Sequence, residues 1–288
     1  MIMEHEIQSI KQQILEAIES GTPIKITGGN SKSFYGREID GTALDMASYS
    51  GIISYEPTEL FITAKAGTPL VLINETLAAK GQGLAFEPSQ INPHTTIGGV
   101  VASGLSGPAR PYIGSVRDFI LGVRCINGLG EELSFGGQVM KNVAGYDLSR
   151  LMTGALGTLG IILDVSIKVL PLPEFELTGR KSLACNDAIK IMNELSARSL
   201  PITAACYDGT FLYLRLSGTK DVVTAAFKLL DFDECPDGND WWKKIRDYQL
   251  PLFNGDKPLW RLSVPSTSTL DLHNDEFLID WGGKTLTA

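Results

Sequence analysis

The stretch Pro93-His-Thr-Thr-Ile-Gly-Gly-Val-Val-Ala-Ser-Gly-Leu-Ser-Gly107 is dense in glycine, alanine and serine. Thr95 or Thr96 is the type of residue that caps the first turn of a helix, so we expect a short helix after it. A planar ring system can lie flat on such a helix, but small residues also let two helices pack closely, so this stretch alone does not decide between the two. The residues that would form the flat face are Gly98, Gly99, Ala102 and Gly104.

A second glycine-rich segment, Gly28 to Gly36, follows the expected strand Pro23-Ile-Lys-Ile-Thr27. Glycines allow successive backbone N–H groups to point into one concavity, and such a nest binds a pyrophosphate. Asn30, Ser31 and Ser33 add amide and hydroxyl donors. An ordinary surface loop is the alternative interpretation of this segment.

The rest of the first 170 residues alternates between helical and strand patterns. Isoleucines at helical spacing and a closing glycine predict a helix over 7–20, and Pro69 opens another helix. The dipeptide Asn127-Gly128 predicts a hairpin. The expected strands are 43–46, 51–55, 60–63, 84–86, 119–126, 132–135 and 161–170, and the expected helices are 7–20, 70–80 and 148–155, with Asp147 as N-cap of the last.

Pro171-Leu-Pro173 marks the expected domain boundary, so we predict a first domain over 1–171 and a second over 172–288. The second domain reads as strand 176–183, helix 186–197, strands 203–207 and 211–216, helix 221–230 and strand 259–264. That order, βαββαβ, predicts a ferredoxin-like α+β layer. Residues 277–281 are expected to add a strand.

Composition excludes several classes of function. The net charge of −8 disfavours a nucleic acid partner, and no apolar run is long enough to cross a bilayer. The four cysteines are scattered and the three histidines are far apart, so no metal site is expected. No G-x-G-x-x-G follows a strand, and Gly283-Lys284-Thr285 lacks the first glycine of a P-loop.

In this order, the glycine-rich segments and those that follow them resemble the PCMH-type FAD-binding domain of the vanillyl-alcohol-oxidase family. The closer resemblance is to the FAD-binding E subunits of bacterial glycolate oxidase (glycolate dehydrogenase). The segments that carry it are Thr96-Ile-Gly-Gly99, Gly107-Pro-Ala-Arg-Pro111, Gly114-Ser-Val-Arg-Asp-Phe119 and Val139-Met-Lys-Asn-Val-Ala-Gly-Tyr-Asp-Leu-Ser-Arg-Leu-Met152. It implies an α+β fold of two FAD-binding subdomains followed by the ferredoxin-like cap domain.

The resemblance also implies the residues that hold FAD. Non-covalent binding is expected, with His94 as a turn residue rather than a point of attachment. The pyrophosphate would lie on Gly28, Gly29, Asn30, Ser31, Lys32 and Ser33. The pyrophosphate and flavin would run along Thr95, Thr96, Gly98, Gly99, Ser103 and Gly104. Gly114 and Ser115 would line the flavin, and Gly157, Gly160 and Ile161 would contact the nucleotide mostly through their backbone.

The resemblance further implies a subunit of a glycolate oxidase complex, in the cytoplasm or at the inner membrane through its partners, a catalytic FAD subunit and an iron–sulfur subunit. The substrate would be a small 2-hydroxy acid, and glycolate would become glyoxylate. Relatives that oxidise D-2-hydroxy acids carry a His-rich stretch in the cap, whereas here only His273 stands in Asp271-Leu-His-Asn-Asp-Glu276.

No catalytic residue can therefore be assigned, and an accessory role is favoured. A stand-alone FAD-dependent oxidoreductase acting on another 2-hydroxy acid or alcohol is the alternative. Relatives also continue beyond the Asp280-Trp-Gly-Gly283 segment, so the cap domain is expected to be incomplete. An arginine is the natural clamp for a substrate carboxylate. The candidates are Arg110, Arg117, Arg215 and Arg261.

Overall fold

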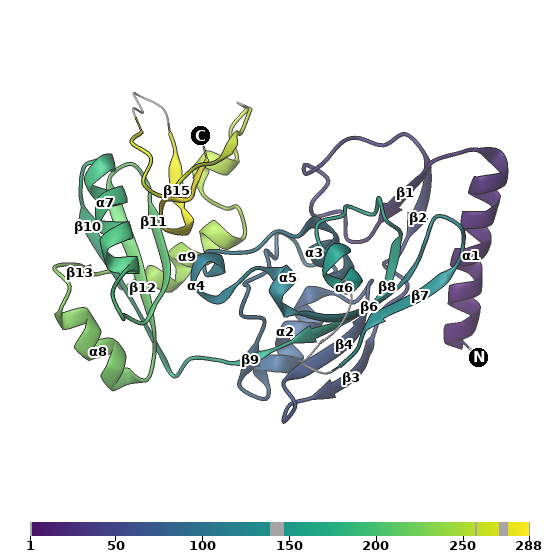
Figure 1. Ribbon diagram of the computed structural model, residues 1–288, viewed down its shortest axis with the longest axis horizontal. Helices are drawn as coiled ribbons and strands as arrows, with labels where there is room; N and C mark the ends of the chain where they lie inside the picture. The colour runs from purple at the N-terminus through teal and green to yellow at the C-terminus, as the bar shows by residue number, and fades with distance from the viewer. Residues whose placement is uncertain (1, 139–146, 257, 271–275, 288) are drawn as a thin grey trace. The chain divides into compact units, whose positions relative to one another are not determined.

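The computed structural model describes residues 2–138, 147–256, 258–270 and 276–287. The part of the motif over 139–146, and His273, lie outside the described residues. The chain divides into two compact units (Figure 1). Unit 1 comprises 1–105 and 115–171, and unit 2 comprises 106–114 and 172–288. One change of unit follows Pro171, and the segment 106–114, which the sequence analysis assigned to the first domain, belongs to unit 2.

Unit 1 is built on a five-stranded antiparallel sheet in the order β3-β4-β8-β6-β7. The central strand β8 is buried along almost its whole length, as a strand covered on both faces must be. A separate parallel pair, β1-β2, follows the first helix. The strands are β1 (Ile24–Thr27), β2 (Thr42–Asp45), β3 (Ile52–Glu56), β4 (Phe61–Lys65), β6 (Ile120–Ile126), β7 (Glu132–Gly136) and β8 (Ile161–Lys168).

Two apolar clusters hold this unit together. One joins α2 and α3 to the sheet, and the other joins Ile7, Ile10 and Ile14 of α1 to β2 and to residues of β6 and β8. Burial of each of those isoleucines contributes about 1.5–3 kcal/mol. The helices are α1 (Ile2–Ser20), α2 (Leu70–Ala78), α3 (Ile97–Ser103), α5 (Val116–Phe119) and α6 (Leu148–Leu151).

A buried polar cluster lies beside the α1 contact. The Tyr49 hydroxyl donates to Asp164 over 3.1 Å, and Nε of Arg124 lies 3.3 Å from the same carboxylate. Burial raises the pKa of Asp164, although Arg124 and the Tyr49 hydroxyl act against that shift. The cluster therefore fixes β8 to β6 and to the segment after β2.

Unit 2 contains the predicted α+β layer. Its antiparallel sheet has the order β13-β10-β12-β11-β15-β16-β14, and the first four of these strands have the order expected of a ferredoxin-like βαββαβ layer. The elements are α4 (Arg110–Ile113), β10 (Phe175–Ser182), α7 (Cys185–Ser196), β11 (Ile202–Tyr207), β12 (Phe211–Gly218), α8 (Lys220–Lys228), β13 (Asp233–Glu234), α9 (Gly238–Arg246), η1 (Pro251–Phe253), β14 (Arg261–Ser263), β15 (Leu278–Asp280), η2 (Trp281–Gly283) and β16 (Thr285–Thr287).

Three sequence predictions about elements are wrong in detail. The strand expected at 84–86 lies instead at β5 (Gln82–Gly83), where it pairs with β9 (Leu170–Pro171). The fourth strand of the βαββαβ layer is β13, not 259–264, which forms β14 at the other end of the sheet. The helix expected over 148–155 ends at Leu151. Two-residue strands carry no alternation, so no hydrophobic pattern could locate β5 or β13.

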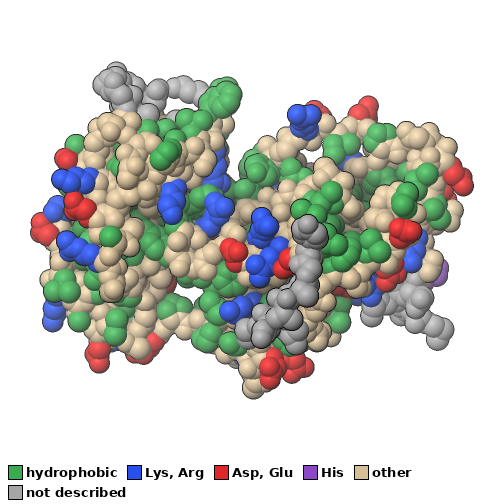
Figure 2. Space-filling view, viewed as in Figure 1, with side chains coloured by type: hydrophobic (Ala, Val, Ile, Leu, Met, Phe, Trp, Pro, Cys, Tyr) green, Lys and Arg blue, Asp and Glu red, His purple; other side chains and the backbone are tan. Residues whose placement is uncertain are grey.

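The surface mixes charges of both signs, and Figure 2 shows acidic and basic side chains interspersed over the face in view. Among the described residues, no helix combines the length and apolar character that a bilayer crossing requires. Within the same residues, no group of three or more His, Cys, Asp or Glu side chains is arranged to hold a metal ion.

Candidate cofactor site in unit 1

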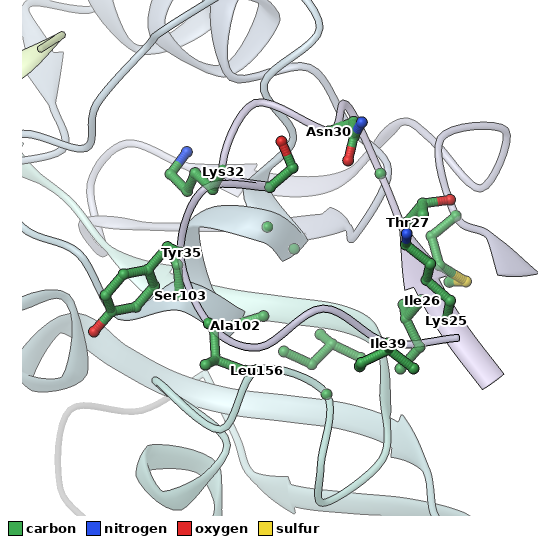
Figure 3. Close-up of a pocket in the computed structure, with 18 of the residues that line it drawn as sticks. Lys25, Ile26, Thr27, Asn30, Lys32, Tyr35, Ile39, Ala102, Ser103 and Leu156 are labelled. Atoms are coloured by element: carbon green, nitrogen blue, oxygen red, sulfur yellow. The ribbon is translucent and has the colours of Figure 1, made fainter. Parts of the chain in front are cut away.

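Unit 1 encloses a cavity of about 700 Å³, within the range typical of ligand pockets (Figure 3). Three parts of the chain form its walls: the end of β1 with the loop that follows it, the helix α3, and the segment before and at the start of β8. Figure 3 shows the loop through Asn30, Lys32 and Tyr35 running around the cavity, with Ala102 and Ser103 of α3 on its wall. All of these parts belong to unit 1.

The helix α3 owes its position to small residues. The Thr96 hydroxyl accepts a hydrogen bond from the Gly99 N–H at 3.3 Å, which confirms Thr96 as the N-cap. A Cβ on Gly98 would lie 2.7 Å from the Cβ of Ala66, so only glycine lets the helix pack this close to the residue that follows β4. The helix therefore packs flush against the sheet on one side and forms the wall of the cavity on the other.

The glycine-rich loop is pressed against the start of the same helix. A Cβ on Gly28 would lie 2.6 Å from the Thr96 hydroxyl oxygen, and one on Gly29 would collide with the carbonyl of His94. Among the described residues, no protein acceptor takes a hydrogen bond from the backbone N–H groups of Gly29, Asn30 or Ser31. Asn30 has a φ of +50°, a conformation that turns neighbouring N–H groups in one direction.

The charge of the cavity suits an anion. Among the described residues, the basic side chains that line it are Lys25, Lys32 and Arg37, and the one acidic side chain is Glu38. The ammonium of Lys32 lies 3.4 Å from the carbonyl oxygen of Ser89. A nest of N–H groups together with these cations fits the diphosphate of a dinucleotide. The apolar residues Ile26, Ile39 and Leu156 offer surface for the rest of such a molecule.

The cavity brings together ten of the seventeen predicted residues, and contact of these ten with FAD stays a prediction. They are Gly28, Asn30, Lys32, Ser33, Thr96, Gly98, Gly99, Ser103, Gly157 and Gly160.

The other seven predicted residues do not line this cavity. Thr95 is buried and its carbonyl accepts from Leu70, Ile161 lies in an apolar cluster, and Gly104 ends α3 with a φ of +66°. Ser115 caps α5 with Asp118, Gly114 belongs to unit 2, and Gly29 and Ser31 lie in the loop beside lining residues.

Several residues of the cavity wall were not foreseen. The side chains at the end of β1 and in the loop that follows match no sequence motif. They line the cavity only because the loop folds back over it. Lys25 and Arg37 are basic residues near a glycine-rich loop, which was the one available signal. The unforeseen residues are Lys25, Ile26, Thr27, Tyr35, Arg37, Glu38, Ile39, Met46, Ala66, Leu156, Thr158 and Ile162.

The structure separates the four candidate arginines. Arg215 is buried, donates to the Thr203 hydroxyl at 3.0 Å and lies 3.8 Å from Glu176, which is a structural arrangement. Arg117 is exposed on α5 in unit 1. Arg110 and Arg261 both stack on the ring of Trp281 in unit 2. His94 is exposed in a turn, where the Asn92 side chain accepts its N–H, and it does not line the cavity.

Comparisons with known proteins agree with these features. A family model described as an FAD binding domain matches residues 4–136. The chain is 46% identical over 276 residues to the glycolate oxidase subunit GlcE of Escherichia coli (strain K12), a match that covers 96% of this chain and 78% of that protein. It is 30% identical over 139 residues to the glycolate oxidase subunit GlcD of Bacillus subtilis (strain 168), which covers 48% of this chain and 29% of that protein.

Among solved structures, an alkyldihydroxyacetonephosphate synthase aligns with a TM-score of 0.67 at 18% identity. The alignment covers 90% of this chain and 60% of that one. At this identity the likeness shows the fold alone, and together with the family model it confirms the predicted fold class.

Proposed function

The chain belongs to the family of the glycolate oxidase subunit GlcE, and from that premise we propose that it is an FAD-binding subunit of a glycolate-oxidising flavoprotein complex. FAD is bound without a covalent bond. The complex converts glycolate to glyoxylate, and this chain contributes a flavin to it in an accessory role.

The observation that carries this proposal is the cavity of unit 1. Its wall includes Asn30, whose N–H has no protein acceptor among the described residues, and the cations Lys25 and Lys32; the unbonded N–H groups of Gly29 and Ser31 lie in the same loop, beside lining residues. Burying a diphosphate requires many donors and positive charge, because an ionised group without partners is costly to remove from water. The loop meets both requirements and lies against the cap of α3.

When bound, FAD supplies a hydride acceptor for the oxidation of an alcohol. The residues of the chain hold and orient that group. The loop 28–33 would take the diphosphate, the small residues Gly99, Ala102 and Ser103 would form a flat wall, and Gly157 and Gly160 would approach the nucleotide through the backbone. These assignments are part of the proposal.

The accessory role rests on how few side chains of the cavity wall could accept a proton. Oxidation of a hydroxy acid needs a group that takes the hydroxyl proton. The cavity wall contains no histidine among the described residues, and Glu38 is the one carboxylate on it. A catalytic flavoprotein and an iron–sulfur subunit are the partners we propose, in the cytoplasm or held at the inner membrane through those subunits.

The test is a reduction titration on the purified chain and on the assembled complex. Apo-protein incubated with excess FAD and then passed over a sizing column should carry flavin absorbance. Anaerobic glycolate should leave the flavin of the isolated chain oxidised and should bleach the flavin of the complex. A chain that stays colourless contradicts FAD binding. Bleaching of the isolated chain contradicts the accessory role and favours a stand-alone oxidoreductase.

A further inference from the structure

One wall of the unit 1 cavity is a single stretch of chain, residues 33–40, which we call the strap. All of its residues are exposed, and it contains no helix or strand. Most of them also line the cavity: Ser33, Tyr35, Gly36, Arg37, Glu38 and Ile39. A segment that is exposed to solvent and also lines a cavity is a wall one chain thick.

Both ends of the strap are fixed. Before it, Gly28 and Gly29 are pressed against the start of α3, where neither has room for a Cβ. After it, the Thr42 N–H donates to the carbonyl of Pro23 at 2.8 Å, and a Cβ on Gly41 would collide with the same carbonyl. The parallel pairing of β1 with β2 begins here. Movement of the strap is therefore confined to the residues between these two anchors.

Between its anchors the strap is held weakly. Among the described residues, no hydrogen bond or ion pair involves residues 36–41. The strap passes close to Leu156, since a Cβ on Gly36 would lie 3.3 Å from Cδ1 of that leucine, and Figure 3 shows Leu156 beneath the strap in this view. Segments with few contacts and an exposed backbone open at a low cost in free energy. The strap therefore belongs to the part of unit 1 that opens most readily.

A ligand in the cavity would lie between the strap and α3, because residues of both line it. Of these two walls, α3 packs flush against the sheet, with no room for a Cβ between Gly98 and Ala66. The strap is therefore the wall that can move. It carries the cation Arg37, which is exposed and has no ion pair among the described residues. A diphosphate in the cavity would attract this guanidinium through charge-assisted hydrogen bonds.

We propose that the strap lifts to admit FAD and closes over it, and that the diphosphate draws it shut through Arg37. This inference rests on the proposed function, because FAD must be the occupant of the cavity. Closure of a loop over a ligand shields the ligand from water and commits it to the site. The strap thus controls how fast the chain gains and loses its flavin.

The first experiment measures how fast trypsin cleaves the full chain after Arg37, with and without excess FAD, with mass spectrometry to identify the cut. FAD should slow this cleavage about tenfold or more, because proteolysis follows the population of the open form. Lys80 is the matched control site, since it is exposed in unit 1 and lies outside the cavity. Cleavage after Lys80 should not change with FAD. Equal protection of both bonds would mean general stabilisation by the ligand and would overturn the proposal.

The second experiment uses stopped-flow flavin fluorescence on Leu156→Ala, which removes the side chain beneath the strap. FAD should then bind and dissociate faster, each by about fivefold, with little change in Kd. Loss of a direct contact with FAD would instead speed dissociation alone. Leu159→Ala is the control, because Leu159 is also exposed in the loop before β8 but does not line the cavity. An unaltered association rate in Leu156→Ala contradicts a strap that must lift.

The same assay tests Arg37. Arg37→Gln should raise the dissociation rate of FAD by about tenfold or more, because it removes the cation that holds the strap closed. Lys80→Gln removes an exposed cation outside the cavity and should leave that rate unchanged. Equal rates in both variants refute the role of Arg37. A chain that takes up no FAD refutes the proposed function and the strap's role with it, whereas a yellow chain whose cleavage after Arg37 ignores FAD refutes the strap alone.

Discussion

Gly99→Ala should weaken FAD binding without weakening the fold. Gly99 lies in the first turn of α3 and lines the cavity. A Cβ there would have one neighbour within 4 Å, the Thr96 hydroxyl oxygen at 3.3 Å, so the methyl group otherwise projects into open space. Replacing a helical glycine by alanine stabilises by about 0.5–1 kcal/mol. The apo-protein should therefore keep its melting temperature or gain slightly.

The same methyl group occupies the space that we assign to FAD. An extra methyl in a close contact costs about 1–3 kcal/mol, which corresponds to a Kd for FAD about 5- to 150-fold higher. Flavin fluorescence titration gives the Kd, and calorimetry of the apo-protein gives the melting temperature. Gly128→Ala is the control, because its Cβ would have no neighbour within 4 Å and it lies outside the cavity. An unaltered Kd in Gly99→Ala, or a parallel loss of stability, would refute the close approach of FAD to α3.

Three further substitutions test the elements around the cavity. Thr96→Ala removes the N-cap of α3, so the melting temperature measured by calorimetry should fall by about 2–4 °C, and Thr96→Ser should restore it. Tyr49→Phe removes a donor to the buried Asp164 and should cost about 1–3 kcal/mol in urea unfolding; an unchanged midpoint would argue against this hydrogen bond. Burial alone would raise the pKa of Asp118, but hydrogen bonds from the N–H and hydroxyl of Ser115 hold this pKa below its usual value. The ionised Asp118 therefore stabilises the fold above about pH 4, and this stabilisation is lost as the pH falls through the pKa of the folded state. The difference in melting temperature between the unaltered chain and Asp118→Asn should therefore shrink on acidification, and a constant difference would contradict this linkage.

The sequence located the parts of the cavity that depend on the absence of a side chain. Gly28 and Gly98 are required because a Cβ at either position would lie too close to another atom. A glycine required in this way is visible in the sequence itself. The caps also left a local signal, since the side chains of Thr96 and Asp147 both accept an N–H from the first turn of a helix, as predicted. The glycine positions and helix caps, which depend on local backbone conformation, could therefore be predicted from the sequence alone.

The roles of side chains that depend on contacts between segments far apart in the chain could not be predicted from the sequence. Arg37 and Ile39 line the cavity because the loop after β1 folds over α3, about 60 residues away in the chain, and no pattern of either segment encodes that meeting. The placement of 106–114 in unit 2 is of the same kind. It is secured by contacts such as the hydrogen bond from Trp281 to Gly107, between residues 174 positions apart.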